Sequence, residues 1–577
     1  MAEYSTEGKL NKREKYKARL KPFEYFKQFE ELDFENLGEG DRFYLQDFGI
    51  FNTDFLEDEF TMRIRVPAGR ITNEQFEHIA KVVDEYDLTI VTTARAGLQL
   101  HNLEADNVLE IWKKLNSMGL TTWQSFGDNI RNIVANIYDG RGRYNEIETY
   151  PIVMQMQEYI VQNPRYTGML PRRVSVAVSG NRASVTSFFA NDLYFALAKK
   201  DGVFGFNVYM GGKNTEIAKD ADIFLLKDEV FEFFKAFVET FYLHGSRFAR
   251  AKTRLFYLIE SIGLDELKSL ISKQYKKPFE SAGELELQKV KFDKNELLKD
   301  GTYSYCYQTD FGRLEADEMK EISSYAIQNN LEIRIGIDQN IYLFGLKEKI
   351  QPFAPAAPSS TIIACAGSLC PYAVWSIKNE TKYLPLQRIS KHGITIGFSG
   401  CAKGCGRHYH TDIGLIGLKT NNFGDTEGGA RVFMGAVHTE GVTINRMIFS
   451  MVPLVHLNET LCIIIDIYEK SGYGDFEEFA YNVLNKYSSE FLALWFLANF
   501  ETKQSLPLSS DTPHKVDTPQ SIEWEKELLV SSFKDVDFLE SWEDGFFNSI
   551  SALSKKLWTI EGEDPIYKPV INRTVFR

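Results

Sequence analysis

Cysteine is scarce in this chain, which has only six cysteines among 577 residues. Small proteins that depend on disulfides have a much higher density of cysteine, so the composition argues against a disulfide scaffold. Isolated thiols also favour a reducing compartment. Hydrophobic residues make up 44% of the chain and aromatic residues 14%, which predicts a globular protein with large cores.

Long hydrophobic runs and an excess of positive charge are also lacking. The most apolar tract, residues 491–500, is about half as long as a helix that spans a bilayer. The formal net charge of −14 argues against a general nucleic-acid-binding protein. The N-terminus is polar and basic, without the pattern of a signal peptide. We therefore expect a soluble, cytoplasmic protein that binds neither membranes nor nucleic acids.

Four of the cysteines form two close pairs in the second half of the chain. The pairs are Cys365 with Cys370, and Cys401 with Cys405. Four thiolates can enclose a structural zinc ion or an iron–sulfur cluster, and the spacing alone does not choose between the two. His408 and His410 follow the second pair closely, so a mixed Cys/His zinc site is also open.

A segment of the first half recurs 243 positions later. Residues 59–103 predict a strand, a turn, a helix capped by Thr72 and a second strand. Aligned without gaps, residues 69–103 share seven identities over 35 positions with residues 312–346. The common order of turn, helix and strand indicates an internal repeat. Likewise, the strands predicted at 412–417 and 430–435 echo two strands of the first half, so the following α/β lobe is also expected to be repeated.

The two copies of the first repeat differ in their polar residues. The first copy has Arg95, Gln99 and His101, whereas the second has Asp338, Tyr342 and Phe344 at the same places. The first copy therefore keeps cationic and polar groups that the second has largely lost. Duplication followed by specialisation of one half would produce this difference.

Several motifs occur together in one order between about residue 40 and residue 490. They are Thr93-x-Arg95-x-x-x-Gln99-x-His101, Asp128-x-x-Arg131-Asn132, Leu170-Pro-Arg-Arg173, Gly205-Phe-x-Val-x-x-Gly-Gly212 and the two cysteine pairs. The ordered set resembles the sirohaem-containing nitrite and sulfite reductases that carry a 4Fe–4S cluster and take electrons from ferredoxin. This resemblance favours an iron–sulfur cluster over zinc.

The resemblance implies a role for each matching residue. The cluster would be held by Cys365, Cys370, Cys401 and Cys405, and Cys405 would also ligate the sirohaem iron. The substrate anion would be bound by Arg95, Arg131 and Arg173. The sirohaem would be seated by Gln99, His101, Gly211 and Gly212, although a purely structural role is as well supported for Gln99 and His101.

The chain departs from the family pattern in two places. The first cysteine pair is one residue shorter than usual. Sulfite reductases usually have two lysines, and nitrite reductases a lysine and an asparagine, where this chain has Arg173 and Ser175. The neutral Ser175 leans slightly toward nitrite, the less highly charged anion.

The resemblance also implies the fold. It is α+β with mixed α/β lobes, in two pseudo-symmetric halves that each combine a ferredoxin-like half-domain with an α/β lobe, in agreement with the repeats. We predict a basic helical segment at 1–45, half-domains at 46–118 and 300–350, the sirohaem- and substrate-binding lobe at 119–290, the cluster-binding lobe at 359–490 and a C-terminal extension at 491–577.

The implied activity is the six-electron reduction of nitrite to ammonia or of sulfite to sulfide. Such small anions must lose water to reach a metal, and fixed guanidinium groups can replace that water. The chain has no dinucleotide fingerprint or flavin domain, so electrons would come from a separate ferredoxin. The basic residues of 9–21 are either a dock for that acidic donor or a solvated helix face. The alternatives are a non-catalytic protein that binds a tetrapyrrole or a cluster, and a zinc-stabilised scaffold.

Overall fold

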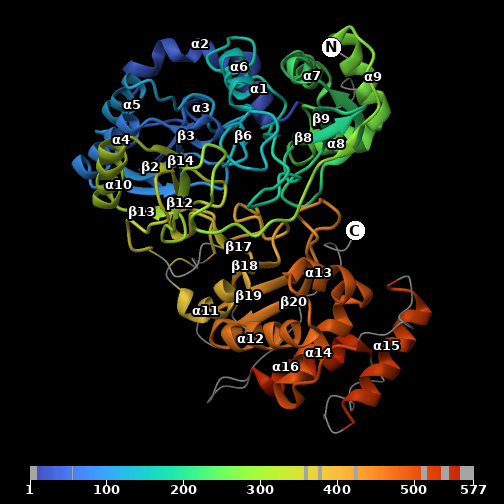
Figure 1. Cartoon of the computed structure of the whole chain (residues 1–577). Coiled ribbons are helices and arrows are strands. Elements are labelled where there is room, and N and C mark those ends of the chain that lie inside the picture. Colours follow the sequence, from blue (N-terminus) through green and yellow to red (C-terminus); the bar gives the residue numbers. More distant parts are fainter. Residues whose placement is uncertain are drawn as a thin grey trace. The chain divides into compact units, whose positions relative to one another are not determined.

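The computed structural model divides the chain into two compact units, Met1–Ala357 and Pro358–Arg577 (Figure 1). The division falls in the proline-rich stretch that follows the second copy of the repeat. The structure describes residues 10–54, 56–356, 361–374, 378, 380–420, 427–507, 516–534 and 545–558.

Two antiparallel sheets in the first unit exchange one strand each. The first sheet has the order β1 (Ile50–Thr53), β2 (Leu56–Ile64), β5 (Leu98–Leu103), β4 (Thr89–Thr92) and β13 (Arg313–Leu314). The second has the order β12 (Tyr303–Tyr307), β15 (Ile341–Leu346), β14 (Glu332–Ile335) and β3 (Arg70–Ile71). The short strands β13 and β3 each complete the sheet of the other copy, through the pairs β13–β4 and β3–β14.

The internal repeat predicted from the sequence is confirmed. The starts of β3, α4 (Asn73–Glu85), β4 and β5 all recur 243 positions later, in β13, α10 (Ala316–Asn329), β14 and β15. Thr72 caps α4 as predicted, because its side chain accepts a hydrogen bond from the N–H of Gln75 at 3.1 Å. The two helices pack against each other, and α4 buries the face of Phe76, Ile79 and Val83.

The first α/β lobe is a sheet with the order β10 (Lys219–Leu225), β9 (Val203–Met210), β8 (Leu193–Lys200), β7 (Val176–Ser179) and β6 (Val134–Ala135). The pairs β6–β7 and β7–β8 are parallel and the others antiparallel. The short β11 (Glu284–Leu285) pairs with β8. The helices of this lobe are α6 (Tyr150–Ile160), α7 (Val230–His244), α8 (Leu255–Ile262) and α9 (Leu264–Tyr275).

The second unit repeats this lobe. Its sheet has the order β16 (Ile362–Ala364), β17 (Ile396–Ser399), β18 (Ile413–Thr420), β19 (Glu427–Met434) and β20 (Arg446–Pro453). The first two pairs are again parallel and the last two antiparallel. The strands β17 and β18 begin 220 positions after β7 and β8, and α12 (Leu454–Ser471) follows β20 as α7 follows β10. The predicted α+β class with two related halves is therefore confirmed.

The apolar tract near residue 495 is a core helix of the second unit. Within α14 (Ser489–Thr502), every residue from 491 to 498 is buried. The helix contacts α12, α15 (Pro519–Ser532), α16 (Phe546–Leu557) and β20, which explains why it is apolar on all sides. Within the described part of the chain, no helix is long and apolar enough to cross a membrane. Residues 508–515, 535–544 and 559–577 of the predicted extension lie outside the described residues.

The remaining helical elements are short or lie near the N-terminus. They are α1 (Lys12–Arg19), α2 (Pro22–Tyr25), η2 (Phe26–Glu31), α3 (Glu39–Leu45), η3 (Gln46–Phe48), η4 (Pro67–Gly69), α5 (Val108–Ser117), η5 (Lys227–Glu229), η6 (Arg250–Lys252), η7 (Gly367–Leu369), η9 (Thr381–Tyr383), α11 (Leu386–His392), α13 (Phe476–Asn482) and η10 (Leu484–Lys486).

A buried ion pair occupies the same place in the two lobes. In the first lobe, Asp192 accepts from Arg254 at 2.6 Å and from the N–H and hydroxyl of Ser175. In the second, 220 positions later, Asp412 accepts from the N–H and hydroxyl of Thr395. Its cation is His438, whose Nε2 lies 3.4 Å from Asp412 and 2.9 Å from Glu477.

The histidine is held in its charged form. Burial alone would lower the pKa of His438, but the carboxylates of Glu477 and Asp412 raise it from 6.5 to about 10. Among the described residues these three form the one group whose possible metal-ligand atoms lie within 4.8 Å of one another. The imidazolium therefore supplies in the second lobe the positive charge that Arg254 supplies in the first.

The strand exchange depends on a glycine at position 69. Gly69 has φ of +71°, and a Cβ there would lie 2.1 Å from the carbonyl oxygen of Ile335 at the end of β14. We expect Gly69→Ala to lower the free energy of unfolding, because it combines unfavourable φ with a backbone clash. Gly202 is the matched control, with φ of +81° and no atom within 4 Å of the added Cβ, so Gly202→Ala should cost only about 1–2 kcal/mol. Urea unfolding measures both, and equal losses would contradict the role of the close approach.

The charged state of His438 predicts a pH dependence of stability. Because its folded pKa lies above the ordinary 6.5, its stabilisation is complete below about pH 6.5 and is lost as the pH rises toward 10, by on the order of a few kcal/mol. In His438→Gln, the decrease in the free energy of unfolding that comes from this histidine should be absent. Urea unfolding between pH 6.5 and 9.5, followed by a spectroscopic signal from the second unit, measures it. His392→Gln, which removes a histidine paired with Glu469, should keep the wild-type slope. A His438→Gln slope equal to that of the wild type would refute the prediction.

Candidate functional site

Four arginines from separate segments converge in the first unit. They are Arg63 in β2, Arg95 between β4 and β5, Arg131 before β6 and Arg173 before β7. Burial lowers the pKa of Arg131 well below its ordinary value, and the positive charges of the other three lower it further. Like charges gathered in a partly buried place are unfavourable unless an anion compensates them. The structure thus brings together the three arginines that the sequence singles out and adds Arg63.

Arg131 has a donor that faces no acceptor. It is 8% exposed, and its two Nη groups donate to the carbonyl oxygens of Ser125 and Gly127. Its Nε is buried and has no hydrogen-bond partner among the residues that the structure describes. Because an unsatisfied buried donor is costly, this Nε fits a site whose ligand is an anion.

Arg63 is oriented by a chain of hydrogen bonds between two neighbouring strands. Its Nε and Nη2 donate to Oε1 of Gln99 at 3.1 and 2.6 Å. The amide nitrogen of Gln99 donates to Nε2 of His101 at 2.9 Å, which leaves the proton of a neutral His101 on Nδ1, 3.3 Å from Oγ1 of Thr61. Gln99 and His101 therefore have the structural role left open above, while a contact with sirohaem stays a prediction.

Arg63 was missed by the sequence argument, although a signal was present. In the strand around residue 63, Arg63 and Arg65 point to one face, and Arg63 pairs directly with Gln99. The guanidinium of Arg63 lies 4.0 Å from the ring centre of Phe126. Arg65 has a different task, because it is buried and donates to the carbonyl oxygens of Ile130 and Arg131 at 2.8 and 3.1 Å.

Ser175, from which the slight preference for nitrite was drawn, is buried against Asp192. The Ser175 hydroxyl donates to Asp192 at 2.7 Å and accepts from the N–H of Asp192 at 3.1 Å. It belongs to the buried ion pair with Arg254 and is only 1% exposed. Its neutrality therefore says nothing about the charge of the substrate.

Gly211 and Gly212, expected to allow close approach of a macrocycle, are explained by the chain itself. Gly211 has φ of +87° at the end of β9. A Cβ on Gly212 would lie 2.3 Å from the carbonyl oxygens of both Phe189 and Asn191. The close approach that requires glycine at 212 is thus made by residues of the same lobe, and contact with sirohaem remains a prediction.

The four paired cysteines gather at the ends of β16 and β17 in the second unit. Sγ of Cys365 accepts from the N–H groups of Gly400 and Gly367 at 3.1 and 3.4 Å. Burial raises the pKa of Cys365 and Cys370, and the nearby Cys405 raises both further. Cys401 also raises the pKa of Cys370, so Cys405 lies near both thiols of the first pair and Cys401 lies near Cys370.

The sulfurs of the described cysteines do not have the spacing of the ligands of one zinc ion. Zinc bonds to sulfur at about 2.3 Å in a tetrahedron, so its sulfurs lie about 3.8 Å apart. Within the described part of the chain, no three of these thiols lie within 4.8 Å of one another. His408 is buried with Nδ1 2.9 Å from Oγ of Ser399, and no zinc-like group that includes it or His410 is found among the described residues.

The cysteines are specific to the second lobe. The 220-residue correspondence places Asn181 at the position of Cys401 and Val185 at that of Cys405. Strand pairing gives a third equivalence. Ala135 pairs with Val178 in the first lobe as Ala364 pairs with Phe398 in the second, so Asn136, which follows Ala135, corresponds to Cys365, which follows Ala364. The first lobe therefore has amide and apolar side chains where the second has thiols.

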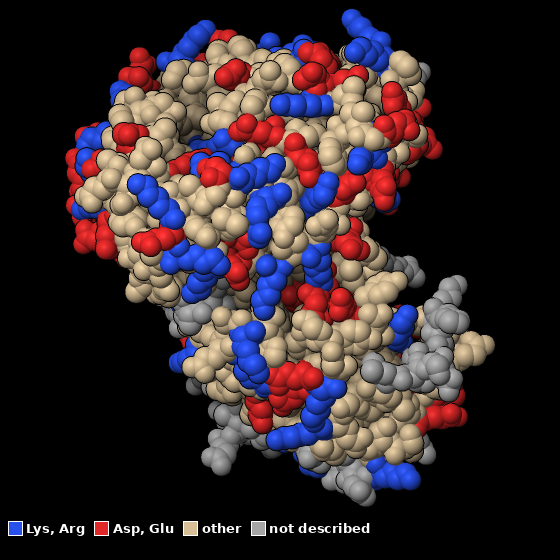
Figure 2. Space-filling model, viewed as in Figure 1, with Lys and Arg blue, Asp and Glu red and all other residues tan. Residues whose placement is uncertain are grey.

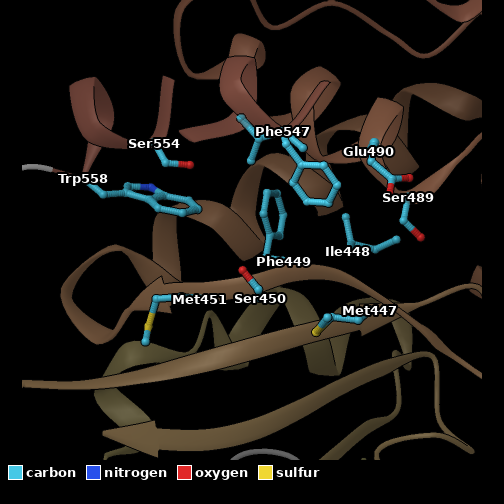
Figure 3. A pocket seen from close by; sticks show the side chains of 11 residues that line it. Met447, Ile448, Phe449, Ser450, Met451, Ser489, Glu490, Phe547, Ser554 and Trp558 are labelled. Carbon is cyan, nitrogen blue, oxygen red and sulfur yellow. The ribbon is translucent and has the colours of Figure 1, made fainter. Parts of the chain in front are cut away.

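One cavity of about 40 Å³ lies within the second unit, between β20, α14 and α16 (Figure 3). Phe449 and Met447 line one side, and Phe547, Ser554 and Trp558 line the other. This volume holds only a few water molecules. Its lining residues include no cysteine and no arginine, so it is separate from both sites above.

The basic N-terminal segment is less exposed than its sequence suggests. On the face seen in Figure 2, lysines and arginines of the first unit are interspersed with acidic residues. Lys17 is 3% and Glu14 5% exposed, so these two residues belong to the buried side of α1. The exposed cations of the segment are Lys12, Lys15, Arg19 and Lys21, whereas Lys9 lies outside the described residues.

Two family models match parts of the first unit. Residues 56–118 match the nitrite/sulfite reductase ferredoxin-like half domain. Residues 126–279 match the nitrite and sulphite reductase 4Fe–4S domain. The second match covers the first lobe, which contains no cysteine.

Similar proteins carry names that agree with these models. The chain is 28% identical over 470 residues to a ferredoxin–nitrite reductase of Synechococcus elongatus, covering 75% of this chain and 91% of that one. It is 30% identical over 413 residues to the chloroplastic ferredoxin–nitrite reductase of Spinacia oleracea, covering 65% and 69%.

A solved structure shares the fold. The Mycobacterium tuberculosis NirA protein matches with a TM-score of 0.74 at 20% identity, covering 82% of this chain and 96% of that one. With the half-domain and lobe models, the spinach relative shows that the chain is an oxidoreductase that belongs to the nitrite and sulfite reductase family, of the ferredoxin-dependent type.

Proposed function

We propose that this enzyme reduces nitrite to ammonia with electrons from ferredoxin, using a sirohaem and a 4Fe–4S cluster. The observation that carries the proposal is the cluster of four arginines with a buried, unpaired donor on Arg131. The names of the relatives add the substrate and the donor. Nitrite, six electrons and eight protons give ammonium and two molecules of water.

The arginines are suited to hold such a substrate. Nitrite must lose water to enter the site, and guanidinium groups replace that water with fixed donors. Arg131 can donate from its Nε, which has no hydrogen-bond partner among the described residues. Arg63 is fixed by Gln99 and by its packing on Phe126, so it is positioned before the anion arrives. Several donors fixed in this way also stabilise the negative charge that develops on a departing oxygen.

The thiols are suited to hold a cluster of iron and sulfur. We assign Cys365, Cys370, Cys401 and Cys405 to the cluster, and Cys405 also to the sirohaem iron. The N–H groups of Gly400 and Gly367 favour the thiolate of Cys365, and the positive charges of Lys378 and Lys403 favour those of Cys365 and Cys370. When bound, the two groups supply the electron transfer and the bond chemistry.

Ferredoxin is the proposed donor, and the exposed part of the basic segment is a candidate dock for it. Lys15, Arg19 and Lys21 are exposed and can meet an acidic partner, whereas Lys12 already pairs with Glu39. A zinc-stabilised scaffold is disfavoured by the open arrangement of the thiols. A non-catalytic tetrapyrrole-binding protein would have no need of four converging guanidinium groups.

Protein produced in cells that make sirohaem tests the cofactors and the substrate together. We expect a Soret band and a red band of a reduced porphyrin, four irons in excess of the haem iron, and acid-labile sulfide. With reduced methyl viologen or ferredoxin, we expect nitrite turnover to exceed sulfite turnover. A colourless protein with one zinc ion would overturn the cofactors, and faster turnover of sulfite would overturn the substrate.

Substitution of Arg63 tests the anion site. Because Arg63→Gln removes a charged donor, kcat/KM for nitrite should fall roughly tenfold to a hundredfold with the visible spectrum retained. Arg165→Gln is the matched control, since Arg165 is a half-exposed arginine that pairs with Glu239, and its kinetics should stay as in the wild type. An Arg63→Gln enzyme with unchanged kcat and KM would remove Arg63 from the site.

A further inference from the structure

Two of the four arginines lie in segments without regular secondary structure, so neighbouring side chains must fix their positions. Arg131 follows the turn at 127–130, and Arg173 lies in the segment 169–175. Two backbone hydrogen bonds join these segments, from the N–H of Arg131 to Val174 O at 2.8 Å and from the N–H of Val174 to Asn129 O at 3.0 Å. Neither segment belongs to a strand or a helix over these residues, so the side chains around them decide where the two arginines lie.

A buried carboxylate lies at the centre of this region. The side chain of Asp128, three residues before Arg131, is fully buried. It accepts from Nζ of Lys17 at 2.9 Å and from Nη2 and Nη1 of Arg250 at 2.6 and 2.8 Å. Arg172 lies 3.9 Å away. Burial would raise the pKa of Asp128, but Lys17 and Arg250 lower it well below its ordinary value, so the carboxylate stays charged.

Both cations also bind the second segment. Nζ of Lys17 donates to the carbonyl oxygen of Leu170 at 2.7 Å, in addition to Asp128. Nη1 of Arg250 donates to the carbonyl oxygen of Pro171 at 3.3 Å, in addition to Asp128. Each cation therefore bridges the segment of Arg131 and the segment of Arg173.

The N-terminal helix α1 is fixed to the same place. The third partner of Lys17 is Glu14 at 2.6 Å, one turn earlier in α1. Glu14 in turn binds Arg247 at 2.7 Å, and Arg247 donates to the carbonyl oxygen of Met169 at 3.1 Å. The side chain of Asn11, which caps α1, donates to the carbonyl oxygen of Arg247 at 2.7 Å.

We infer that Lys17, Asp128 and Arg250 form a buried clamp that positions Arg131 and Arg173 for anion binding, and that α1 serves the substrate site through this clamp. The inference rests on the proposed function for the identity of the anion. Asp128 also supplies a negative charge that favours protonated Arg131 against its three cationic neighbours. Removing one member of a buried ion pair leaves the others uncompensated, so the clamp is sensitive to single substitutions.

Lys17→Met in the holoenzyme is the direct test. It removes the charge and the donors while keeping a chain of similar length, and Arg250 still pairs with Asp128. We expect KM for nitrite to rise roughly tenfold while kcat changes less, with reduced methyl viologen as donor so that ferredoxin docking plays no part. Lys27→Met is the matched control, because Lys27 is an exposed lysine that pairs only with the surface residue Glu24, and it should leave KM unchanged.

Amide hydrogen exchange gives a second readout that does not depend on turnover. The N–H groups of Arg131 and Val174 should exchange faster in Lys17→Met than in the wild type, and in Lys27→Met they should not. Asp128→Asn should act in the same direction as Lys17→Met. Asp139→Asn is the control for a lost buried carboxylate, because Asp139 accepts from Thr149 and Arg70 instead, and it should lower stability without changing KM or the exchange of these two amides.

The outcomes separate the clamp from the proposed function. Unchanged exchange at Arg131 and Val174 in Lys17→Met would overturn the clamp. Faster exchange with an unchanged KM would overturn its role in positioning the arginines. A wild-type enzyme that turns over neither nitrite nor sulfite would refute the proposed function, and the exchange experiment would still decide whether the clamp exists.

Discussion

Repulsion among the four guanidinium groups of the anion site is the constraint on which the first unit depends. Arg63, Arg95, Arg131 and Arg173 come from four segments, and the positive charges of the other three lower the pKa of the buried Arg131. Three features of the fold offset this repulsion. Gln99 accepts a hydrogen bond from Arg63, backbone carbonyl groups accept from Arg131, and the carboxylate of Asp128 supplies a negative charge nearby. The proposed anion site is therefore built from groups that must be held together by their surroundings.

The features that could be predicted from the sequence are those that depend on local pattern. Alternation of polar and apolar residues located β2, the cap at Thr72 located α4, and the 243-residue repeat gave the symmetry of the two sheets. The three arginines of the ordered motifs do converge. What could not be predicted depends on contacts between distant segments. Nothing local shows that Lys17, on a basic helix, is buried against Asp128, or that Ser175 faces Asp192 and not the anion.

Duplication explains why related lobes can carry different chemistry. Both lobes keep the same strand order and a buried ion pair at the same place, with Arg254 in one and His438 in the other. At the ends of the equivalent strands, one lobe has Asn136 and Asn181 where the other has Cys365 and Cys401. The sheet thus holds the loops in the same position in both lobes, and the residues in those loops decide whether a lobe has cysteines that can bind a metal cluster.

The exchange of β3 and β13 also limits how the chain can fold during synthesis. Domains ordinarily fold in order as they leave the ribosome. Here the first sheet lacks its last strand until residues 313 and 314 have been made, and β3 has no partner until β14 exists. The edge of the first sheet therefore stays unpaired while more than two hundred further residues are synthesised. Unpaired sheet edges are prone to aggregate, so this is the interval in which a chaperone would protect the chain.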